Sequence, residues 1–180
     1  MKFPFFRIVP IAIAAIAIMI NIRIRNEFEK HKIDRVFNQT KEYAFATVTT
    51  PAFCMGAIAL AQSLRNNHGD NYDYLCLVTK DVNAVWRRIL SQWWIVIEVP
   101  EKKPHYWYRR SWIKLALWAF TEYKKIVYLD TDTLCFGSLD DLFKEPELSC
   151  VADVSPPQIC NTGVLVLEPN TTTYYDMLEK

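Results

Sequence analysis

Two aspartates at the end of an apolar run are the residues of this sequence best suited to chemistry. Asp130 and Asp132 follow the segment 125–129, whose β-branched and aromatic residues predict a buried strand. In open sheets of alternating strands and helices, ligands bind at the carboxyl ends of the strands. Two carboxylates in this place can turn toward one hard cation, which can neutralise the phosphates of a nucleotide. The pair therefore indicates a metal and diphosphate site.

Alternating strand and helix patterns surround this pair. Strands are expected at 43–49, 74–79, 94–99, 125–129, 149–152 and 164–167. Helices are expected at 55–66, 82–92, 111–123 and 173–180, where the chain ends. On the second of these helices, Val85, Trp86 and Ile89 are expected to face the core. The alternation predicts an α/β fold whose mostly parallel sheet is flanked by helices on both faces.

Composition excludes some classes of function. The chain has 180 residues, 51% of them hydrophobic, which is enough for the core of one domain. Its net charge of +1 supplies no field that would attract nucleic acid, so no nucleic-acid partner is expected. The five cysteines form no CxxC pair, which argues against a structural zinc site. Most of them are expected in the core, and their odd number argues against a closed disulfide framework.

An apolar segment precedes the α/β region. Residues 3–22 are almost entirely apolar, which is about the length of 20 residues that a bilayer requires. Residues 1–22 are expected to form a single hydrophobic helix that anchors the chain in a membrane; a signal peptide and a buried amphipathic helix are the alternatives. The charged segment 23–42 is expected to be a stem or linker, or else a solvated helix. Residues 43–180 form the expected globular domain.

Two features predict opposite orientations in the membrane. Arg23, Arg25 and Lys30 follow the apolar segment and favour a cytosolic domain under the positive-inside tendency. The sequons that begin at Asn38 and Asn170 instead suit glycosylation in a lumen. We expect a single-pass protein of the Golgi or another endomembrane, with a cytosol-facing domain as the alternative.

Several short motifs follow one another in an order that resembles a known family. They are Ala44-Phe45-Ala46-Thr47-Val48-Thr49-Thr50, Gly56-Ala57, Ser63-Leu64, Trp112-Ile113-Lys114-Leu115, Leu129-Asp130-Thr131-Asp132-Thr133-Leu134, Asp141-Leu142-Phe143, Asn161-Thr162-Gly163-Val164 and Glu168-Pro169. In this order they resemble the glycogenin-like glycosyltransferase family 8 over about 43–180. The resemblance implies a GT-A fold with a Rossmann-like sheet. It also implies transfer of a sugar from a UDP-sugar donor to a carbohydrate or glycoconjugate acceptor.

The resemblance assigns the uracil of the donor to the first strand and the turn after it. Thr47, Thr49 and Thr50 match the family's positions there. Hydroxyl and backbone groups at the carboxyl end of a strand offer directional hydrogen bonds to a planar base, and Phe53 can cover the face of that base. The alternative is that these are ordinary strand threonines.

Metal and phosphate binding are assigned by the resemblance to charged residues. Asp130 and Asp132 match the aspartates that coordinate Mn²⁺ or Mg²⁺, and Asp130 also approaches the ribose. The metal would bridge the pyrophosphate and stabilise the UDP leaving group. Lys114 matches a lysine that reaches the phosphate or sugar of the donor. The alternatives are a capped turn with two solvated acids and a lysine that extends to solvent.

A third group of residues is assigned to the sugar. Asn161 and Gly163 match a stretch that lines the sugar site in the family, with Thr162 between them. An amide offers both a donor and an acceptor to sugar hydroxyls, and glycine permits a close approach of the backbone. Asp153, at the end of the preceding strand, is a further candidate. The alternative is a simple turn at 161–163.

Two stretches of the family pattern have no counterpart in this sequence. One carries a candidate catalytic acid, and the other carries a histidine that is the third metal ligand together with a phosphate-binding lysine. His31, His68 and His105 all precede Asp130, and none of them occupies the position of that ligand. The catalytic residue is therefore unknown, and the sequence predicts the donor half of a domain that is incomplete at its C-terminus.

The combined prediction is a metal-dependent retaining transferase of a glucose-like sugar, with a homodimer as a possible state. A non-catalytic or degenerate UDP-sugar-binding module and an inactive gene fragment are the alternatives. A dehydrogenase of the Rossmann type is disfavoured, because no Gly-x-Gly-x-x-Gly motif follows Thr49.

Overall fold

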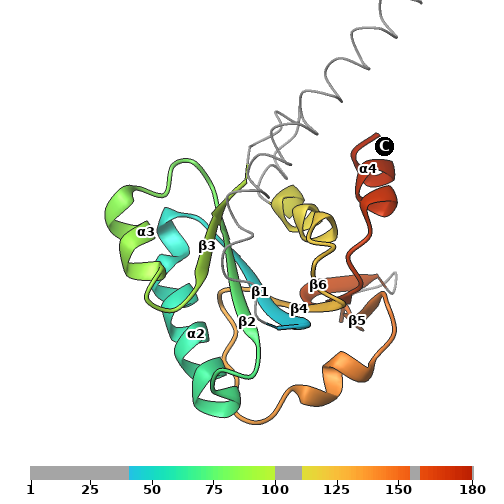
Figure 1. Ribbon diagram of the computed structural model, residues 1–180, viewed down its shortest axis with the longest axis horizontal. Helices are drawn as coiled ribbons and strands as arrows, with labels where there is room; N and C mark the ends of the chain where they lie inside the picture. Colours follow the sequence, from blue (N-terminus) through green and yellow to red (C-terminus); the bar gives the residue numbers. More distant parts are fainter. Residues whose placement is uncertain (1–40, 100–110, 155–158, 180) are drawn as a thin grey trace, which may run out of the picture. The chain divides into compact units, whose positions relative to one another are not determined.

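The computed structural model describes residues 41–99, 111–154 and 159–179 (Figure 1). The expected membrane anchor at 1–22, nearly all of the expected stem at 23–42 and the sequon at Asn38 lie outside these residues. Among the residues that are described, no helix has both the length and the apolar character needed to cross a bilayer.

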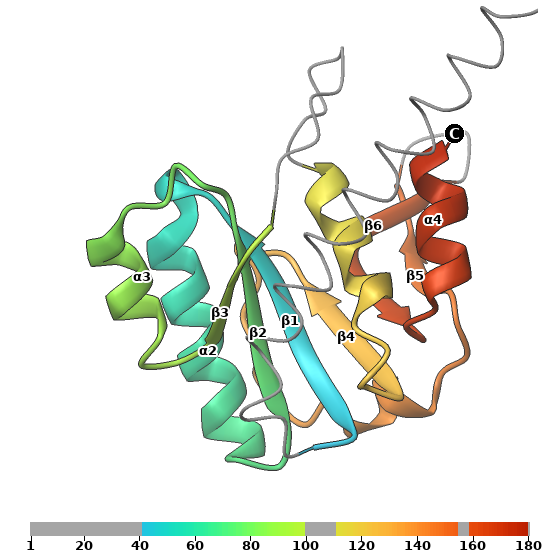
Figure 2. The same ribbon diagram turned by 45° about the horizontal axis from the view of Figure 1, so that its top comes forward.

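The described residues form a mixed sheet of six strands in the order β3-β2-β1-β4-β6-β5 (Figures 1 and 2). The strands from β3 to β4 run parallel to one another, whereas β6 is antiparallel to both of its neighbours. The connection from Ala152 to Cys160 is shorter than the crossover that parallel strands require, so β6 must reverse direction. The prediction of an α/β fold is confirmed: three of the five strand pairings among the described residues are parallel, and the two antiparallel pairings of β6 make the sheet a mixed one. The strands are β1 Tyr43–Thr49, β2 Asp73–Val78, β3 Ile95–Glu98, β4 Lys125–Leu129, β5 Ser149–Ala152 and β6 Cys160–Leu167.

Helices cover both faces of this sheet, as the alternation predicted. Two α-helices, α2 and α3, pack together on one side, while η3 and α4 lie together on the other side (Figure 2). The α-helices are α2 Cys54–His68, α3 Ala84–Leu90 and α4 Thr171–Glu179, and the 3-10 helices are η2 Pro51–Phe53, η3 Ser111–Ala119 and η4 Asp140–Lys144.

The ends of α2 and α3 follow from their local sequences. After α2, Gly69 adopts a φ of 57°, which a glycine reaches without strain, and its N–H caps the Arg65 carbonyl at 2.9 Å. The side chain of Asn83 caps α3 by accepting the Trp86 N–H at 3.0 Å.

The expectation that Val85 of α3 faces the core is wrong, because Val85 is 67% exposed.

The apolar face of α3 is shifted along the helix from the predicted one. Val82 and Leu90 are buried, and Trp86 is partly buried against the core. Ile89 is only half-buried. The helix has two turns rather than three, so Val82 precedes it and Leu90 is its one fully buried residue.

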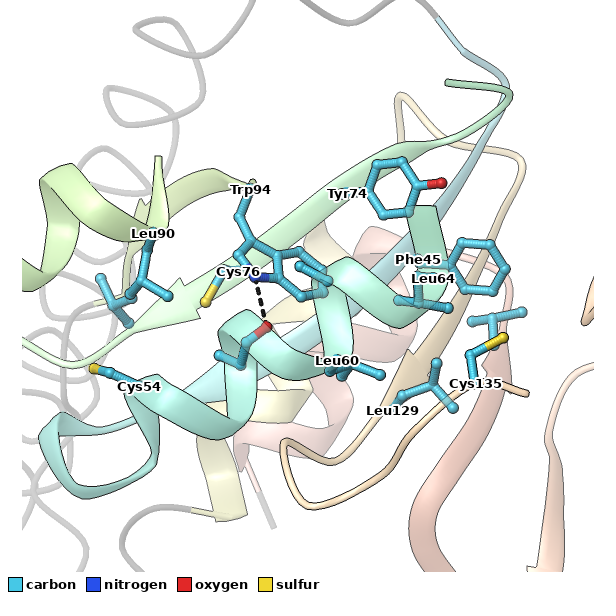
Figure 3. Packing of buried hydrophobic residues seen from close by; sticks show 14 of the residues in the cluster. Phe45, Cys54, Leu60, Leu64, Tyr74, Cys76, Leu90, Trp94, Leu129 and Cys135 are labelled. Atoms are coloured by element: carbon cyan, nitrogen blue, oxygen red, sulfur yellow. Dashed lines mark hydrogen bonds between the residues drawn. The ribbon is translucent and has the colours of Figure 1, made fainter. Parts of the chain in front are cut away.

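The main core lies between α2 and the first strands of the sheet (Figure 3). Phe45 from β1, Leu60 from α2 and Tyr74 from β2 are almost completely buried there. The indole Nε1 of Trp94 donates a hydrogen bond of 3.0 Å to the carbonyl oxygen of Ala57, so the polar atom of this ring is satisfied inside the core. Every residue of β2 is buried, as expected for a strand between two parallel neighbours.

The cysteines divide into two groups. Cys54, Cys76 and Cys135 are buried free thiols, which confirms the expectation that most cysteines belong to the core. Burial raises the pKa of the Cys54 thiol, so it stays protonated. No framework of several disulfides is present among the described residues, but the remaining pair, Cys150 of β5 and Cys160 of β6, forms one disulfide that the sequence analysis did not predict. An odd total count is compatible with one bridge between two neighbouring strands.

Candidate functional site

Asp130 lies where the order of the strands changes direction. The chain leads from β1 to β2 on one side of β1, whereas β4 lies on the other side. The pairing of β1 with β4 ends at Ala46 and Tyr128. Beyond that point the two strand ends lead into separate loops, which is the arrangement in which open α/β sheets bind ligands.

A lysine from η3 reaches the first aspartate. The Lys114 Nζ atom lies 2.9 Å from Asp130 Oδ1, 3.0 Å from the carbonyl oxygen of Thr162 and 3.2 Å from Thr162 Oγ1. The side chain of Lys114 is only 14% exposed, whereas that of Asp130 is 37% exposed. The ion pair is therefore sheltered on the lysine side and open to solvent on the carboxylate side.

Tyr128 contacts both members of this ion pair. Its hydroxyl donates a hydrogen bond to Asp130 Oδ1, and the Lys114 Nζ atom lies 4.6 Å from the centre of its ring. Burial, reinforced by the negative charge of Asp130, raises the pKa of the Tyr128 phenol far above its ordinary value. The phenol is therefore a permanent hydrogen-bond donor to the carboxylate.

The antiparallel strand β6 brings the predicted sugar residues beside Asp130. The Asp130 N–H donates to the Gly163 carbonyl at 2.8 Å, which continues the pairing of β4 with β6. A Cβ atom at Gly163 would lie 3.4 Å from Asp130 Oδ2 and 3.0 Å from Asn161 Oδ1. Residues 161–163 belong to a strand and do not form the simple turn that was the alternative.

Asn161 and Asp153 extend the same row of polar groups toward the edge of the sheet. The Oδ1 atom of Asn161 accepts the Gly163 N–H at 2.9 Å, and its Nδ2 atom lies 3.5 Å from Asp153 Oδ2. Asn161 is exposed and Asp153 is half-buried. The structure thus brings Asp153, Asn161, Gly163, Asp130 and Lys114 together in one connected row.

The second aspartate of the pair has a different environment. Asp132 is exposed, and no partner for its carboxylate lies among the described residues. Carboxylate oxygens are the ligands that Mg²⁺ and Mn²⁺ prefer, so Asp130 and Asp132 fit a hard cation chemically. Within the described ranges, no group of three His, Cys, Asp or Glu residues is placed to hold a metal ion.

The three predicted uracil residues are buried at the end of β1. The Thr47 hydroxyl donates to the Leu129 carbonyl at 2.7 Å, and the Thr49 hydroxyl donates to the Thr50 carbonyl at 3.2 Å. Thr47, Thr49 and Thr50 are at most 5% exposed. Their role with a base stays a prediction. Phe53, on η2 directly after them, is 52% exposed and offers an aromatic surface at this end of the sheet.

Helix α2 approaches the loop that carries the aspartates closely enough to require glycine. A Cβ atom at Gly56 would lie 2.4 Å from the Thr131 carbonyl oxygen, which is closer than real atoms approach. Farther along α2, Ser63 Oγ accepts the Cys135 N–H at 3.0 Å, and Asn67 Nδ2 donates to the Cys135 carbonyl at 3.1 Å. One helix therefore fixes the loop on both sides of Asp132.

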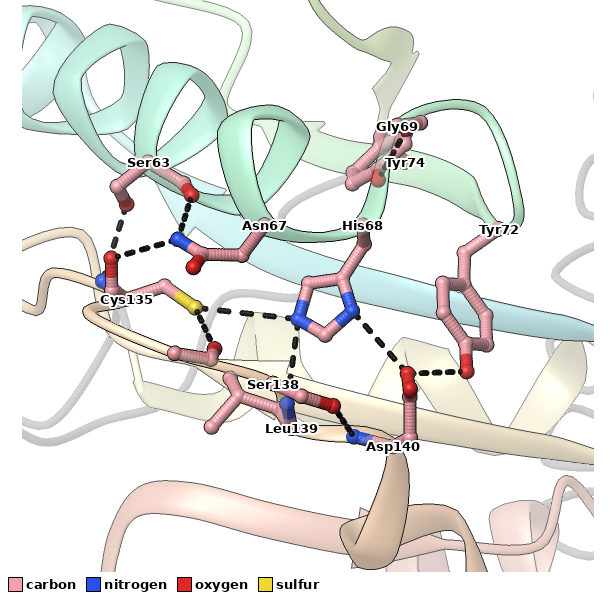
Figure 4. Close-up of polar contacts among 11 residues, drawn as sticks. Ser63, Asn67, His68, Gly69, Tyr72, Tyr74, Cys135, Ser138, Leu139 and Asp140 are labelled. Atoms are coloured by element: carbon pink, nitrogen blue, oxygen red, sulfur yellow. Dashed lines mark hydrogen bonds and ion pairs between the residues drawn. The ribbon is translucent and has the colours of Figure 1, made fainter.

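His68 completes this attachment (Figure 4). Its Nε2 atom accepts the Leu139 N–H at 3.2 Å, so Nδ1 carries the proton and donates to Asp140 Oδ1 at 3.1 Å. The Tyr72 hydroxyl donates to the same oxygen at 2.7 Å. Hydrogen bonds from Tyr72 and Ser138 hold the pKa of the Asp140 carboxyl below its usual range. His68 of α2 is therefore a structural residue that holds the loop at Leu139 and Asp140.

Sequence reasoning did not find two residues of the site, Tyr128 and Thr162. Side chains two apart on a strand share a face, so the position of Tyr128 two residues before Asp130 was the available signal. Thr162 was noted only as the residue between Asn161 and Gly163. Its role depends on the pairing of β4 with β6, which joins segments far apart in the chain.

Comparisons with known proteins agree with this arrangement. The family model described as Glycosyl transferase family 8 matches residues 22–180. Human glycogenin-1 is 32% identical over 151 residues, which cover 76% of this chain and 42% of that protein. UDP-glucuronate:xylan alpha-glucuronosyltransferase 1 of Arabidopsis thaliana is 32% identical over 147 residues, which cover 77% of this chain and 22% of that protein. The chain thus spans less than half the length of these curated relatives.

Solved structures show the same fold at low sequence identity. An active-site mutant of LgtC superimposes with a TM-score of 0.60 at 16% identity, over 76% of this chain and 61% of that chain. Because the family model spans far more than half of the sequence, and the glycogenin likeness lies within the same range, the assignment rests on two independent comparisons. This chain belongs to glycosyltransferase family 8 and is glycogenin-like.

Proposed function

We propose that this chain is the donor-binding part of a retaining glycosyltransferase, which moves a glucose-like sugar from a UDP-sugar to an acceptor hydroxyl with the help of Mn²⁺ or Mg²⁺. The observation that carries the proposal is the position of Asp130. It follows a buried strand at the switch point of the sheet, pairs with Lys114 at 2.9 Å and lies beside Gly163 of β6.

The names of related proteins support the choice of donor and acceptor. One relative is named for transfer from UDP-glucuronate to xylan, and LgtC, a galactosyltransferase by its printed description, has been solved with donor and acceptor sugar analogues. A UDP-sugar donor and a carbohydrate acceptor hydroxyl are therefore the substrate classes that we extend to this chain.

The charges of the site explain why a cation is needed. Asp130, Asp132 and Asp153 place three carboxylates in or beside the row, whereas Lys114 is the one ammonium group of the row. A diphosphate would be repelled by this excess of negative charge. Asp130 and Asp132 would hold a divalent cation, which supplies positive charge to the leaving diphosphate.

The other residues of the row would bind and orient the donor. Lys114 would donate hydrogen bonds to diphosphate oxygens, while Asn161 and the backbone at Gly163 would contact sugar hydroxyls. In the reaction, the bond between the sugar C1 and the phosphate oxygen breaks, and UDP leaves with the electron pair. The acceptor oxygen forms the new bond to C1, and its proton passes to the departing diphosphate, which carries the electron pair of the broken bond.

Thermal unfolding tests the binding part of this proposal. UDP is expected to raise the melting temperature only when Mn²⁺ is present, because the carboxylates otherwise repel it. Asp132→Ala is expected to abolish the rise, whereas the control Asp141→Ala should keep it, since Asp141 is 90% exposed and pairs with Lys144 at 2.6 Å. An equal shift with and without Mn²⁺ would contradict the assignment.

Release of UDP from UDP-glucose separates a transferase from a module that only binds. Both functions predict the thermal shift, but only the transferase releases UDP faster in the presence of Mn²⁺ and an acceptor sugar. Binding without any such release would support the non-catalytic alternative.

A further inference from the structure

Each of the three N–H donors of the Lys114 ammonium group has an acceptor in this structure. A lysine has three N–H donors, and these face Asp130 Oδ1 at 2.9 Å, the Thr162 carbonyl at 3.0 Å and Thr162 Oγ1 at 3.2 Å. The ring of Tyr128 lies under the ammonium, with its centre 4.6 Å from Nζ. Lys114 is therefore held in place by the protein and does not extend freely into solvent.

The same carboxylate oxygen is occupied from two directions. Lys114 and the Tyr128 hydroxyl both donate to Asp130 Oδ1, while Oδ2 faces the backbone of Gly163. Tyr128 is 1% exposed, so its ring is fixed by the sheet beneath it. One face of Asp130 therefore already has a positive charge bound to it.

This arrangement conflicts with simple binding of a metal to the ligand-free protein. A divalent cation at Asp130 would lie within a few ångströms of the Lys114 ammonium, and like charges at this distance repel strongly in a sheltered site. A diphosphate removes the conflict, because its oxygens give Lys114 new acceptors and give the cation new ligands.

We propose that Lys114 is an exchangeable counter-ion on Asp130, positioned by Tyr128 and Thr162, which leaves the carboxylate to a divalent cation only when a nucleoside diphosphate takes over its ammonium group. The inference rests on the proposed function, since it concerns how the same site loads its donor. It predicts that the cation and the diphosphate bind as a pair and that neither binds well alone.

The affinity for Mn²⁺ without nucleotide tests this directly. Electron paramagnetic resonance of free Mn²⁺ gives the affinity of the protein for the metal alone, and calorimetry with UDP gives the affinity for the pair. Lys114→Met should raise the affinity for Mn²⁺ alone about tenfold or more, and should weaken binding of UDP with Mn²⁺ by a similar factor. The two effects have opposite signs, which a loss of folding would not produce.

Two further variants separate charge from other causes. Lys114→Arg keeps the positive charge and should keep the weak affinity for Mn²⁺ alone. Adding Asp130→Asn to Lys114→Met should remove the affinity that was gained, because Asp130 is the ligand that became free. Lys124→Met is the matched control, since Lys124 is 65% exposed and pairs with Glu42 at 2.8 Å.

The outcomes also distinguish this inference from the proposed function. Unchanged or weaker binding of Mn²⁺ alone to Lys114→Met would overturn the counter-ion inference, even if wild-type protein binds UDP with Mn²⁺. A gain in Mn²⁺ affinity without any binding of UDP to the wild type would support Lys114 as the counter-ion that keeps the cation from Asp130, and would overturn the nucleotide-sugar function.

Discussion

Two parts of the sheet differ in how much of their side chains they bury. The scaffold part, 43–98, contains β1 to β3 with α2 and α3, and all residues of β2 are buried. The site part, 111–154 together with 159–167, contains β4, β5 and β6 with η3, and three of the four residues of β5 are exposed. The scaffold part supplies most residues of the main core, with Val127, Leu129 and Val166 among those that the site part adds, whereas the exposed side chains of β5 and the start of β6 can meet a ligand.

The direction of the strands accounts for much of this difference. Parallel strands joined by helices are covered on both faces, so β1 and β2 consist of nearly continuous apolar residues. The reversed strand β6 has a buried end at Leu165–Leu167 and an exposed end at Cys160–Thr162. Its buried end holds it to β4, and its exposed end carries Asn161 and Thr162 to Asp130. Substitutions in the two parts should therefore affect different properties.

The largest expected effect on stability lies in the scaffold part. Phe45→Ala should lower the free energy of unfolding by about 3–5 kcal/mol, because it empties a fully buried site between β1 and α2. Urea denaturation measures this change. The control is Phe136→Ala, which should cost less than about 0.5 kcal/mol because Phe136 is 91% exposed. Similar losses in the free energy of unfolding of the two variants would contradict the difference in burial between the scaffold part and the site part.

The disulfide is expected to be the main covalent support of the site part. Cys150 and Cys160 are separated by 10 residues, and closing a loop of this length stabilises by about 2–3 kcal/mol. A reductant should lower the denaturation midpoint of the wild type accordingly. The variant with Cys150→Ser and Cys160→Ser should not respond to reductant, since the remaining cysteines are free thiols. A lower denaturation midpoint of that variant in reductant would mean that the loss of stability in the wild type does not come from this disulfide.

The contact between the two parts at Gly56 is expected to have a smaller effect. Gly56→Ala should destabilise by about 1–3 kcal/mol, because the new methyl group collides with the Thr131 carbonyl. In an unhindered helix the same change would be stabilising. Gly137→Ala, outside any helix, is the control for adding a methyl group without a collision, since nothing lies within 4 Å of its Cβ position. Stabilisation by Gly56→Ala, measured by thermal unfolding, would show that α2 and the aspartate loop are not tightly joined.

The smallest expected effect concerns pH and the attachment of the loop by His68. The hydrogen bonds from Tyr72 and Ser138 lower the pKa of Asp140 in the folded state. Its contribution is therefore present above its unfolded pKa of about 3.9 and is lost as the pH falls through the folded value. Urea midpoints between pH 5 and pH 3 should fall slightly less in Asp140→Asn than in the wild type. A steeper fall in the variant would mean that another group controls the acid sensitivity.

The scaffold part could be predicted well from the sequence, because its signals are local. The strand at 43–49 has the predicted bounds, and the helix expected at 55–66 is present at Cys54–His68. In the site part, the strand at 125–129 has its predicted bounds for the same reason. The position of Asp130 at a strand end also followed from its own neighbours. Apolar runs and turn residues are sufficient for such features.

The remaining features depend on contacts between distant segments. The place of β6 beside β4, the bond between Cys150 and Cys160 and the contact of Lys114 with Thr162 all require the pairing of strands that no local pattern encodes. The exposure of Val85 depends on how α3 rotates on the core. The assignment of Thr47, Thr49 and Thr50 to the uracil came from the family resemblance, and these residues are buried at the end of β1.

The most direct test of the account is to measure stability and ligand binding on one variant, Asp130→Asn. Calorimetry should show that binding of UDP with Mn²⁺ weakens about a hundredfold or more, because the amide removes a charged ligand of the site. The free energy of unfolding should change by less than about 2 kcal/mol, because Asp130 lies outside the apolar core. Unchanged binding of UDP with Mn²⁺ in a folded Asp130→Asn protein would contradict the account.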